Sequence, residues 1–268
     1  MVKLTPRLAK SKFGAAAPFS FFSIARKSQL RYHPPDMISD CEIWLSLDLS
    51  SSTGSLAIHR QTGNEVACLA DEIIGQGFQH SEWLFSRLEP FLKGHSLNVQ
   101  QIDRFITTSG PGSFTGLRVG LAAWKAVAMA REKPLELISG SEARALAWLS
   151  GEKHLELPTE LTVLTHVSLD KYVQARFNIL PFSQVKLITE TVVQESAFHT
   201  PIETGVKFLL DEKSRGENFS GVPAFQREIF PLRAKHLGTA LTRATSRRSL
   251  VIPSDYINAG PEYFGSSF

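Results

Sequence analysis

Residues 107–120 read TTSGPGSFTGLRVG, a glycine-rich stretch around which the other predicted elements are arranged. A strand-like run, 104–108, enters it, and a long helical pattern ending near residue 130 leaves it. The N–H groups and the positive dipole end of a helix start make such a turn suited to an anion. Gly110 and Gly112 permit a positive φ, and either Ser113 or Thr115 can cap the first helical N–H groups.

The glycine spacing does not match the two common phosphate-binding motifs. No Gly-Lys-Ser/Thr follows, so the lysine of a P-loop is missing. Gly110, Gly112 and Gly116 approach the dinucleotide pattern G-x-G-x-x-G, but the third glycine comes one place late. Two interpretations therefore stay open, a phosphate-binding loop and a tight turn that caps a packed helix.

A second polar turn follows the apolar run 42–48, which ends at Asp48. An Asp at the end of a strand can hold a metal-bound water, and neighbouring hydroxyls can contact phosphate. The alternative is a turn that satisfies its own backbone. Our hypothesis for phosphate or nucleotide contact names both turns: Asp48, Ser50, Ser51, Gly110, Gly112 and Ser113.

Composition narrows the class of protein. Of the 268 residues 43% are apolar, so we expect an ordinary hydrophobic core. Only two are cysteines, which favours a reducing compartment, and we expect the cytoplasm. Nothing approaches the roughly 18 consecutive apolar residues of a membrane span. Residues 1–36 hold seven of the 29 basic and one of the 26 acidic residues, which leaves 22 basic against 25 acidic. This mildly acidic remainder does not favour a stand-alone nucleic-acid binder.

The basic leading segment, residues 1–40, has three interpretations. Its apolar patch at 15–22 is a poor secretory signal, and its acid-poor composition also fits a transit peptide. The third interpretation, which we prefer, is a disordered tail or a mis-assigned start, because Met37 directly precedes the first clear strand.

The remaining chain predicts two related α/β lobes with mixed sheets flanked by helices, over 41–150 and 151–268. Each half opens with three strand-like runs joined by tight turns. In the second half, helices are expected over 201–210 and 234–244. The basic run 246–249 is expected to be solvated surface.

Two helices carry a predicted partner interface. Small residues recur at Gly116, Gly120 and Ala123, where either core packing or a helix of a second subunit could approach closely. On the helix that begins near residue 80, two aromatic residues fall off the buried stripe. The predicted interface consists of Trp83, Phe85, Phe114, Thr115, Gly116, Arg118, Gly120, Ala123, Trp124 and Val127.

These motifs resemble a known family. The runs LDLSS at 47–51, HSE at 80–82, SGPGSFTGLRVGL at 109–121 and SEA at 141–143 follow one another as in TsaB (YeaZ) proteins. TsaB is the dimerisation subunit of the bacterial machinery that makes threonylcarbamoyladenosine on tRNA. The resemblance is strong over 43–149 and weak beyond.

The resemblance implies a two-lobed actin-like ATPase fold and a set of partners. TsaB pairs with TsaD, the catalytic subunit acting on adenosine 37 of tRNA, and the ATPase TsaE joins them. It also forms homodimers through first-lobe helices. The resemblance implies that the chain needs no cofactor of its own and that ATP or ADP could bind only at the partner interface. It also implies that the chain contacts tRNA only as part of the complex.

The resemblance also implies the absence of a catalytic metal site. TsaD-like catalysts carry two metal-binding histidines, H-x-x-x-H, which align with Gly140 and Arg144 here. Neither residue is a metal ligand of that kind. This favours a partner subunit over a transferase. The alternatives are a nucleotide-binding ATPase or small-molecule kinase using Asp48, and a peptidase, for which no Ser/His/Asp order is evident.

Overall fold

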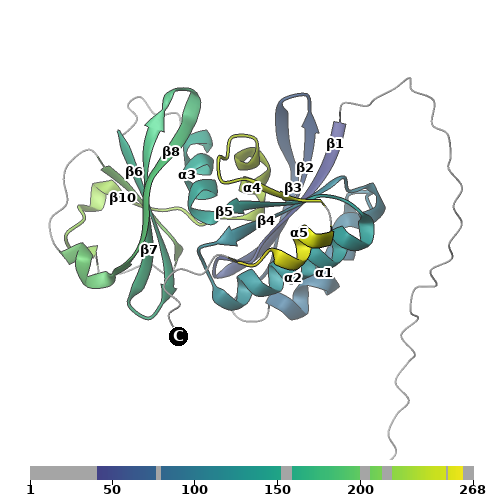
Figure 1. The fold of residues 1–268 in the computed structure, drawn as a ribbon, viewed down its shortest axis with the longest axis horizontal. Coiled ribbons are helices and arrows are strands. Elements are labelled where there is room, and N and C mark those ends of the chain that lie inside the picture. Colours follow the sequence, from purple (N-terminus) through teal and green to yellow (C-terminus); the bar gives the residue numbers. More distant parts are fainter. Residues whose placement is uncertain are drawn as a thin grey trace, which may run out of the picture. The chain divides into compact units, whose positions relative to one another are not determined.

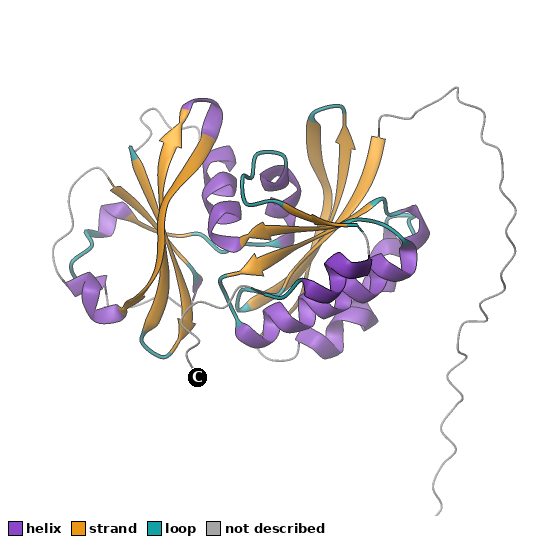
Figure 2. Ribbon diagram, viewed as in Figure 1, coloured by secondary structure: helices purple, strands orange, loops and turns teal. Residues whose placement is uncertain are grey.

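The computed structural model describes residues 41–76, 80–151, 159–199, 206–212, 219–251 and 253–261. The prediction of a tail or mis-assigned start over 1–40 lies outside these residues, as do residues 152–158, which follow the predicted division between the two halves. Figure 1 shows the elements in chain order, and Figure 2 separates helices from strands.

The first sheet is built on an antiparallel meander. This meander consists of β1 (Cys41–Asp48), β2 (Thr53–Thr62) and β3 (Glu65–Gln76). β4 (Arg104–Gly110) runs parallel to β1, β5 (Leu135–Ser139) runs parallel to β4, and β11 (Arg248–Leu250) pairs antiparallel with β5. The order of these six strands is β11-β5-β4-β1-β2-β3.

The second sheet repeats the same plan. Its meander is β6 (Glu160–Ser168), β7 (Lys171–Leu180) and β8 (Gln184–Gln194). β9 (Val206–Leu210) then runs parallel to β6, and β10 (Arg227–Ile229) runs parallel to β9. The order is β10-β9-β6-β7-β8. The predictions that each half opens with three strands joined by turns and that the sheets are mixed are confirmed.

Helices cover both faces of the first sheet (Figure 1). On one face lie α1 (His80–Gly94), α2 (Phe114–Arg131) and α5 (Pro253–Asn258), and they share an apolar cluster with β1 and β4. On the other face, α3 (Gly140–Gly151) and α4 (Ala234–Leu241) share a second cluster with residues of both sheets. Short 3-10 helices span Val99–Gln101, Pro181–Ser183, Glu195–His199 and Ala224–Gln226.

Two expectations for the second half are corrected. Residues 206–210 were expected to be part of a helix. They form β9 instead, because they pair in parallel with β6. The division into 41–150 and 151–268 does not follow the sheets, since β11 pairs with β5 of the first sheet. The chain returns because the apolar side chains of α5, such as Tyr256, complete the first cluster.

Candidate functional site

The two polar turns singled out in the sequence meet at one edge of the first sheet. Asp48 is the last residue of β1, and Gly110 is the last residue of β4. The two strands run parallel, in register from Trp44 opposite Arg104, so both carboxyl ends reach the same edge. Ligands of open α/β sheets bind outside such an edge.

Asp48 is buried and held by its own turn. Its Oδ1 accepts hydrogen bonds from the Ser50 amide at 3.1 Å, the Ser50 hydroxyl at 2.6 Å and the Thr108 hydroxyl at 3.4 Å. Its Oδ2 accepts one from the Ser51 hydroxyl at 3.3 Å. Burial raises the pKa of Asp48, and the bonds from Ser50 oppose that shift. This geometry matches the self-satisfying turn weighed as the alternative to phosphate contact.

The glycine-rich loop closes onto the turn after β1. The Ser113 amide donates to the Ser50 carbonyl oxygen at 2.8 Å. Gly112 has φ +156°, and a Cβ there would lie 2.6 Å from that same oxygen. Ser113 caps α2, its hydroxyl accepting from the Gly116 amide at 3.3 Å, which confirms one of the two predicted caps. One of the amides at the helix start is thus already bound to the protein's own backbone.

A buried arginine faces this turn from α3. Arg144 is 3% exposed, and its Nη1 donates to the Thr165 hydroxyl at 2.8 Å and the Leu164 carbonyl oxygen at 3.3 Å. Burial lowers the pKa of Arg144, while the negative charges of Asp211, Asp48 and Glu212 oppose that shift. The guanidinium therefore lies among acids of both sheets.

Asp211 and Glu212 were not singled out from the sequence. Asp211 accepts a hydrogen bond from the His166 amide at 2.7 Å, and Glu212 accepts from the hydroxyls of Ser52 and of Thr53, the latter at 3.0 Å. The acid pair directly follows β9, and this position was obscured because 206–210 was expected to be helical. Within the described ranges, no three His, Cys, Asp or Glu side chains form a group that could hold a metal ion.

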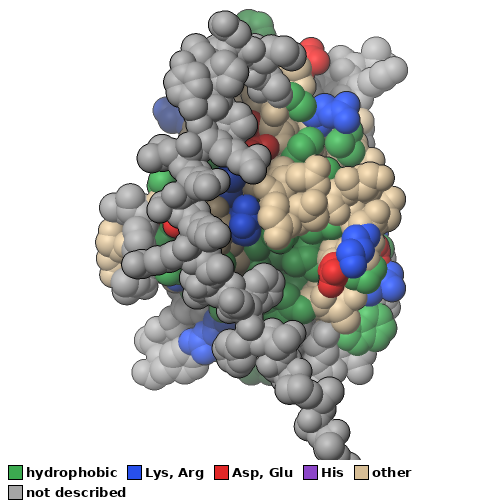
Figure 3. Space-filling model, turned by 90° about the vertical axis from the view of Figure 1, so that its right-hand side faces the viewer, with side chains coloured by type: hydrophobic (Ala, Val, Ile, Leu, Met, Phe, Trp, Pro, Cys, Tyr) green, Lys and Arg blue, Asp and Glu red, His purple; other side chains and the backbone are tan. Residues whose placement is uncertain are grey.

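The predicted interface residues divide into two groups. Trp83 and Phe85 of α1 are 46% and 58% exposed, and Phe114, Thr115 and Arg118 of α2 are also exposed, with Val127 half-buried. The Arg118 guanidinium lies 3.9 Å from the centre of the Phe114 ring. In a space-filling view of one side of the molecule, hydrophobic side chains adjoin Lys, Arg and acidic ones (Figure 3).

The other four predicted interface residues lie in the core, which corrects that part of the prediction. Gly116, Gly120, Ala123 and Trp124 are buried. A Cβ on Gly120 would lie 3.6 Å from a methyl carbon of Leu49 and 3.7 Å from one of Leu47. The small residues let the backbone of α2 approach β1 of the same chain, so intramolecular packing explains the stripe.

Comparisons with known proteins give two kinds of likeness. Residues 76–166 match the family described as "TsaD: tRNA N6-adenosine threonylcarbamoyltransferase". A relative with that enzyme name from Erythrobacter litoralis is 27% identical over 172 residues, covering 60% of this chain and 45% of the relative. One from Novosphingobium aromaticivorans is 33% identical over 86 residues, covering 32% of this chain and 25% of the relative. The chain thus spans less than half the length of these relatives.

The structural likeness extends further along the chain. A Pseudomonas aeruginosa protein described as similar to peptidase YEAZ superposes with a TM-score of 0.63 at 17% identity, over 83% of this chain and 99% of that one. YeaZ from the same organism gives 0.59 at 16% identity, over 74% and 90%.

The fold and the likenesses define a class. The chain is an α/β protein with two mixed sheets flanked by helices, as predicted, and it has the fold of the YeaZ structures. More narrowly, it resembles YeaZ (TsaB) proteins in fold and the TsaD family in the sequence of residues 76–166, as the motifs predicted. No helix among the described residues is long and apolar enough to cross a membrane.

Proposed function

We propose that this chain is a non-catalytic partner subunit that binds and activates a TsaD-like enzyme. The reaction would be formation of N6-threonylcarbamoyladenosine at position 37 of tRNA. Two likenesses support the proposal: the fold of YeaZ and the sequence of threonylcarbamoyltransferases over residues 76–166. A TsaE-like ATPase and tRNA would join through the complex.

The observation that carries the proposal is the environment of the two positions aligned with the catalysts' histidines. At Gly140, an added Cβ would lie 3.1 Å from the Pro111 carbonyl oxygen and 3.3 Å from that of Gly110, so a side chain is crowded by backbone. At Arg144, a buried guanidinium lies near Asp48 and Asp211. A fixed positive charge there would repel a metal cation, so its presence favours a role without metal chemistry.

The exposed parts of α1 and α2 are the surface we assign to the partner. Trp83 and Phe85 on α1 are joined by Phe114 and Arg118 on α2. Exposed aromatic residues beside an arginine are typical of interface anchors. ATP or ADP, if bound, would lie at this contact, and a homodimer would compete for the same surface.

Co-purification tests the assignment with a matched pair of variants. Phe85→Ser removes an aromatic ring, 58% exposed, from the proposed surface, and Phe225→Ser removes one that is 78% exposed beside β10. We expect Phe85→Ser to reduce recovery of the TsaD-like protein at least tenfold, since buried aromatic anchors contribute about 2 kcal/mol or more. Phe225→Ser should bind normally. Equal recovery with both variants would remove this surface from the proposal.

A further inference from the structure

A pocket of about 510 Å³ opens at the end of the first sheet where β1 and β4 begin, whereas Asp48 lies at the other end of β1. It lies beside the first residues of β1 and β4 and just beyond α4, and its lining includes Trp44, Gln61, Arg104, Thr242, Arg243 and Arg247. The volume falls in the range of about 300–1,000 Å³ typical of small-molecule sites. Glu42 in this lining and Asp48 are six positions apart along β1, a distance of roughly 20 Å.

Two of the pocket's arginines are held by a fully buried carboxylate. Glu136 of β5 is 0% exposed, and it accepts hydrogen bonds from Arg247 Nε at 3.0 Å and Arg247 Nη2 at 3.1 Å. Arg104 Nη1 and the Ser249 hydroxyl, the latter at 3.0 Å, donate to the same carboxylate. The run 246–249 is exposed, as expected, and two of its side chains also belong to this fixed cluster.

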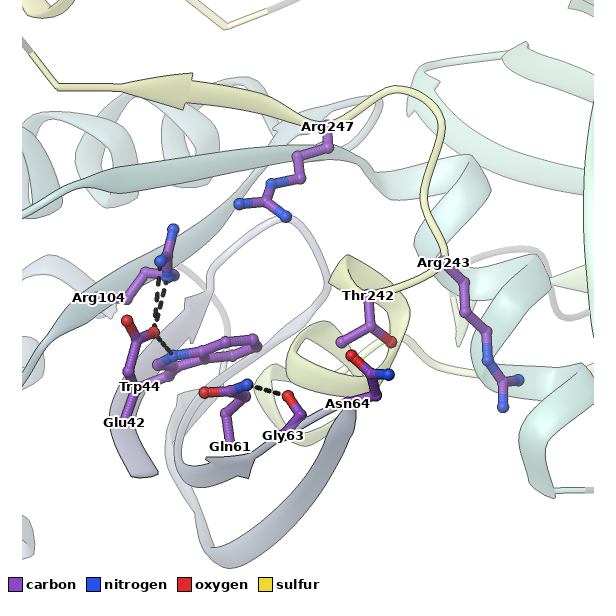
Figure 4. A pocket seen from close by; sticks show the side chains of 9 residues that line it. All are labelled: Glu42, Trp44, Gln61, Gly63, Asn64, Arg104, Thr242, Arg243 and Arg247. Carbon is purple, nitrogen blue, oxygen red and sulfur yellow. Dashed lines mark hydrogen bonds and ion pairs between the residues drawn. The ribbon is translucent and has the colours of Figure 1, made fainter. Parts of the chain in front are cut away.

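Arg104 is held from a second side as well. Its Nε and Nη2 each lie 3.3 Å from Glu42 Oε2, which also accepts from the Trp44 indole N–H at 2.6 Å. The guanidinium carbon lies 5.5 Å from the centre of the Trp44 ring. Figure 4 shows Arg104 and Arg247 facing each other across the pocket, with Trp44 and Gln61 below them. Groups fixed in this way are preorganised for a ligand.

The charges of the pocket favour an anion. Three arginines line the pocket: Arg104 of β4, Arg243 after α4 and Arg247 just before β11. Glu42 and Glu136 hold Arg104, and Glu136 also holds Arg247. Arg243 instead donates from Nη1 to the Ser150 hydroxyl at 3.0 Å. Each guanidinium carries five N–H donors. Arg247 gives two of them to Glu136, and Arg104 gives three to Glu42 and Glu136 among the described residues. Further N–H donors of both groups can therefore point to a ligand.

We propose that this pocket binds a small phosphate monoester with a hydroxylated organic part. A phosphate presents several oxygens that can bridge guanidinium groups from different directions, whereas a carboxylate engages one fork. Gln61, Asn64 and Thr242 supply neutral polar groups on the other side of the pocket, suited to hydroxyls. The site is separate from the proposed partner surface and does not depend on it.

Calorimetric titration of the full chain with ribose 5-phosphate tests this inference. Arg247→Lys and Arg104→Lys each keep a positive charge beside Glu136 but remove one of the two guanidinium groups that face each other across the pocket. The control is Arg60→Gln, because exposed Arg60 neighbours Gln61 on β2 but points to the opposite face of the strand. We expect each pocket variant to bind at least tenfold more weakly and the control to bind as the parent does.

Three further outcomes decide against the proposal. If ribose 5-phosphate did not bind at concentrations up to about 5 mM, the proposal would be overturned, because even marginal ligands bind in the millimolar range. Ribose or citrate binding as tightly as ribose 5-phosphate would show that phosphate is not what the pocket selects. Equal weakening by Arg60→Gln would assign the effect to overall charge. Thermal melting of each variant separates loss of binding from loss of fold.

Discussion

Arg144 on α3 donates a hydrogen bond from Nη1 to the hydroxyl of Thr165 on β6 over 2.8 Å. The bond links a helix packed on the first sheet to the central part of the second. Asp48 and Asp211 add electrostatic attraction to the same guanidinium. Arg144 occupies the position that aligns with a metal-binding histidine of TsaD-like catalysts. In this protein the buried guanidinium has a structural role.

Replacing Arg144 by methionine should therefore destabilise the protein. The change leaves buried Asp48 and Asp211 without their positive neighbour, and removing one member of a buried charge cluster costs about 3–5 kcal/mol. Urea unfolding should show this loss for Arg144→Met. The exposed Arg60→Met should change the free energy of unfolding by no more than about 0.5 kcal/mol. Similar stability of the two variants would contradict the structural role.

The buried His59 should make the protein sensitive to mild acid. Burial lowers the pKa of His59 to about 4 from 6.5. The pKa of His59 is lower in the folded than in the unfolded protein. The stability associated with neutral His59 is therefore fully present above pH 6.5, and it is lost as the pH falls toward 4. A shift of this size corresponds to a change in the free energy of unfolding of about 3–4 kcal/mol at most. Burial also lowers the pKa of His236 to about 4, which acts in the same direction.

A variant isolates the contribution of His59 from the rest. Asp48 acts in the opposite sense, since its pKa is raised by burial. His59→Gln keeps a polar group near the Ser46 hydroxyl, which lies 2.7 Å from His59 Nε2, and removes the titration. Thermal melts between pH 4.5 and pH 7 should show a smaller loss of stability for the variant than for the parent. An unchanged loss would assign the acid sensitivity elsewhere.

Two glycines of α2 should respond oppositely to alanine. A Cβ on Gly116 would collide with the backbone of Leu49, so Gly116→Ala should cost about 1–3 kcal/mol by overpacking. On Gly120 the added carbon would meet side chains at 3.6–3.7 Å, an ordinary contact. Gly120→Ala should therefore be neutral or stabilise by up to about 1 kcal/mol through helix propensity. Chemical unfolding of both variants checks the sign, and equal effects would contradict the packing of α2 on β1.

The closed turn at Asp48 predicts no binding of MgATP by the isolated chain. The Ser113 amide is already bound to Ser50, and four hydrogen bonds surround the Asp48 carboxylate. Calorimetry should detect no heat of binding up to about 1 mM nucleotide. This concentration corresponds to a binding free energy of roughly −4 kcal/mol. Tight binding that disappears in Asp48→Asn would instead favour the ATPase or kinase alternative.

Local patterns in the sequence predicted much of the fold. Alternation and tight turns identified both meanders, and Ser113 was one of the two residues predicted to cap the start of α2. The small-residue stripe correctly indicated a close approach, but periodicity states which residues are buried and not what covers them. Gly120 therefore could not be assigned to the core of its own chain or to a partner from sequence alone.

The remaining differences come from long-range pairing. Val206–Leu210 has too few residues for its period to separate a helix from a strand, and its pairing with β6 decides the outcome. The return of β11 to β5, and with it the contact of Arg247 with Glu136, joins residues 111 positions apart. No local signal encodes such a contact, so neither the domain division nor the arginine pocket could be foreseen.

We propose that this chain performs no transfer itself and that the enzyme that does so requires it. Reconstituted threonylcarbamoyladenosine formation tests this proposal, using tRNA, an activated threonylcarbamoyl donor, ATP, a TsaD-like subunit and a TsaE-like ATPase, with this chain present or omitted. We expect product only when both the chain and the TsaD-like subunit are present. Product formed by this chain without the TsaD-like subunit, or the same rate with the chain omitted, would contradict the account.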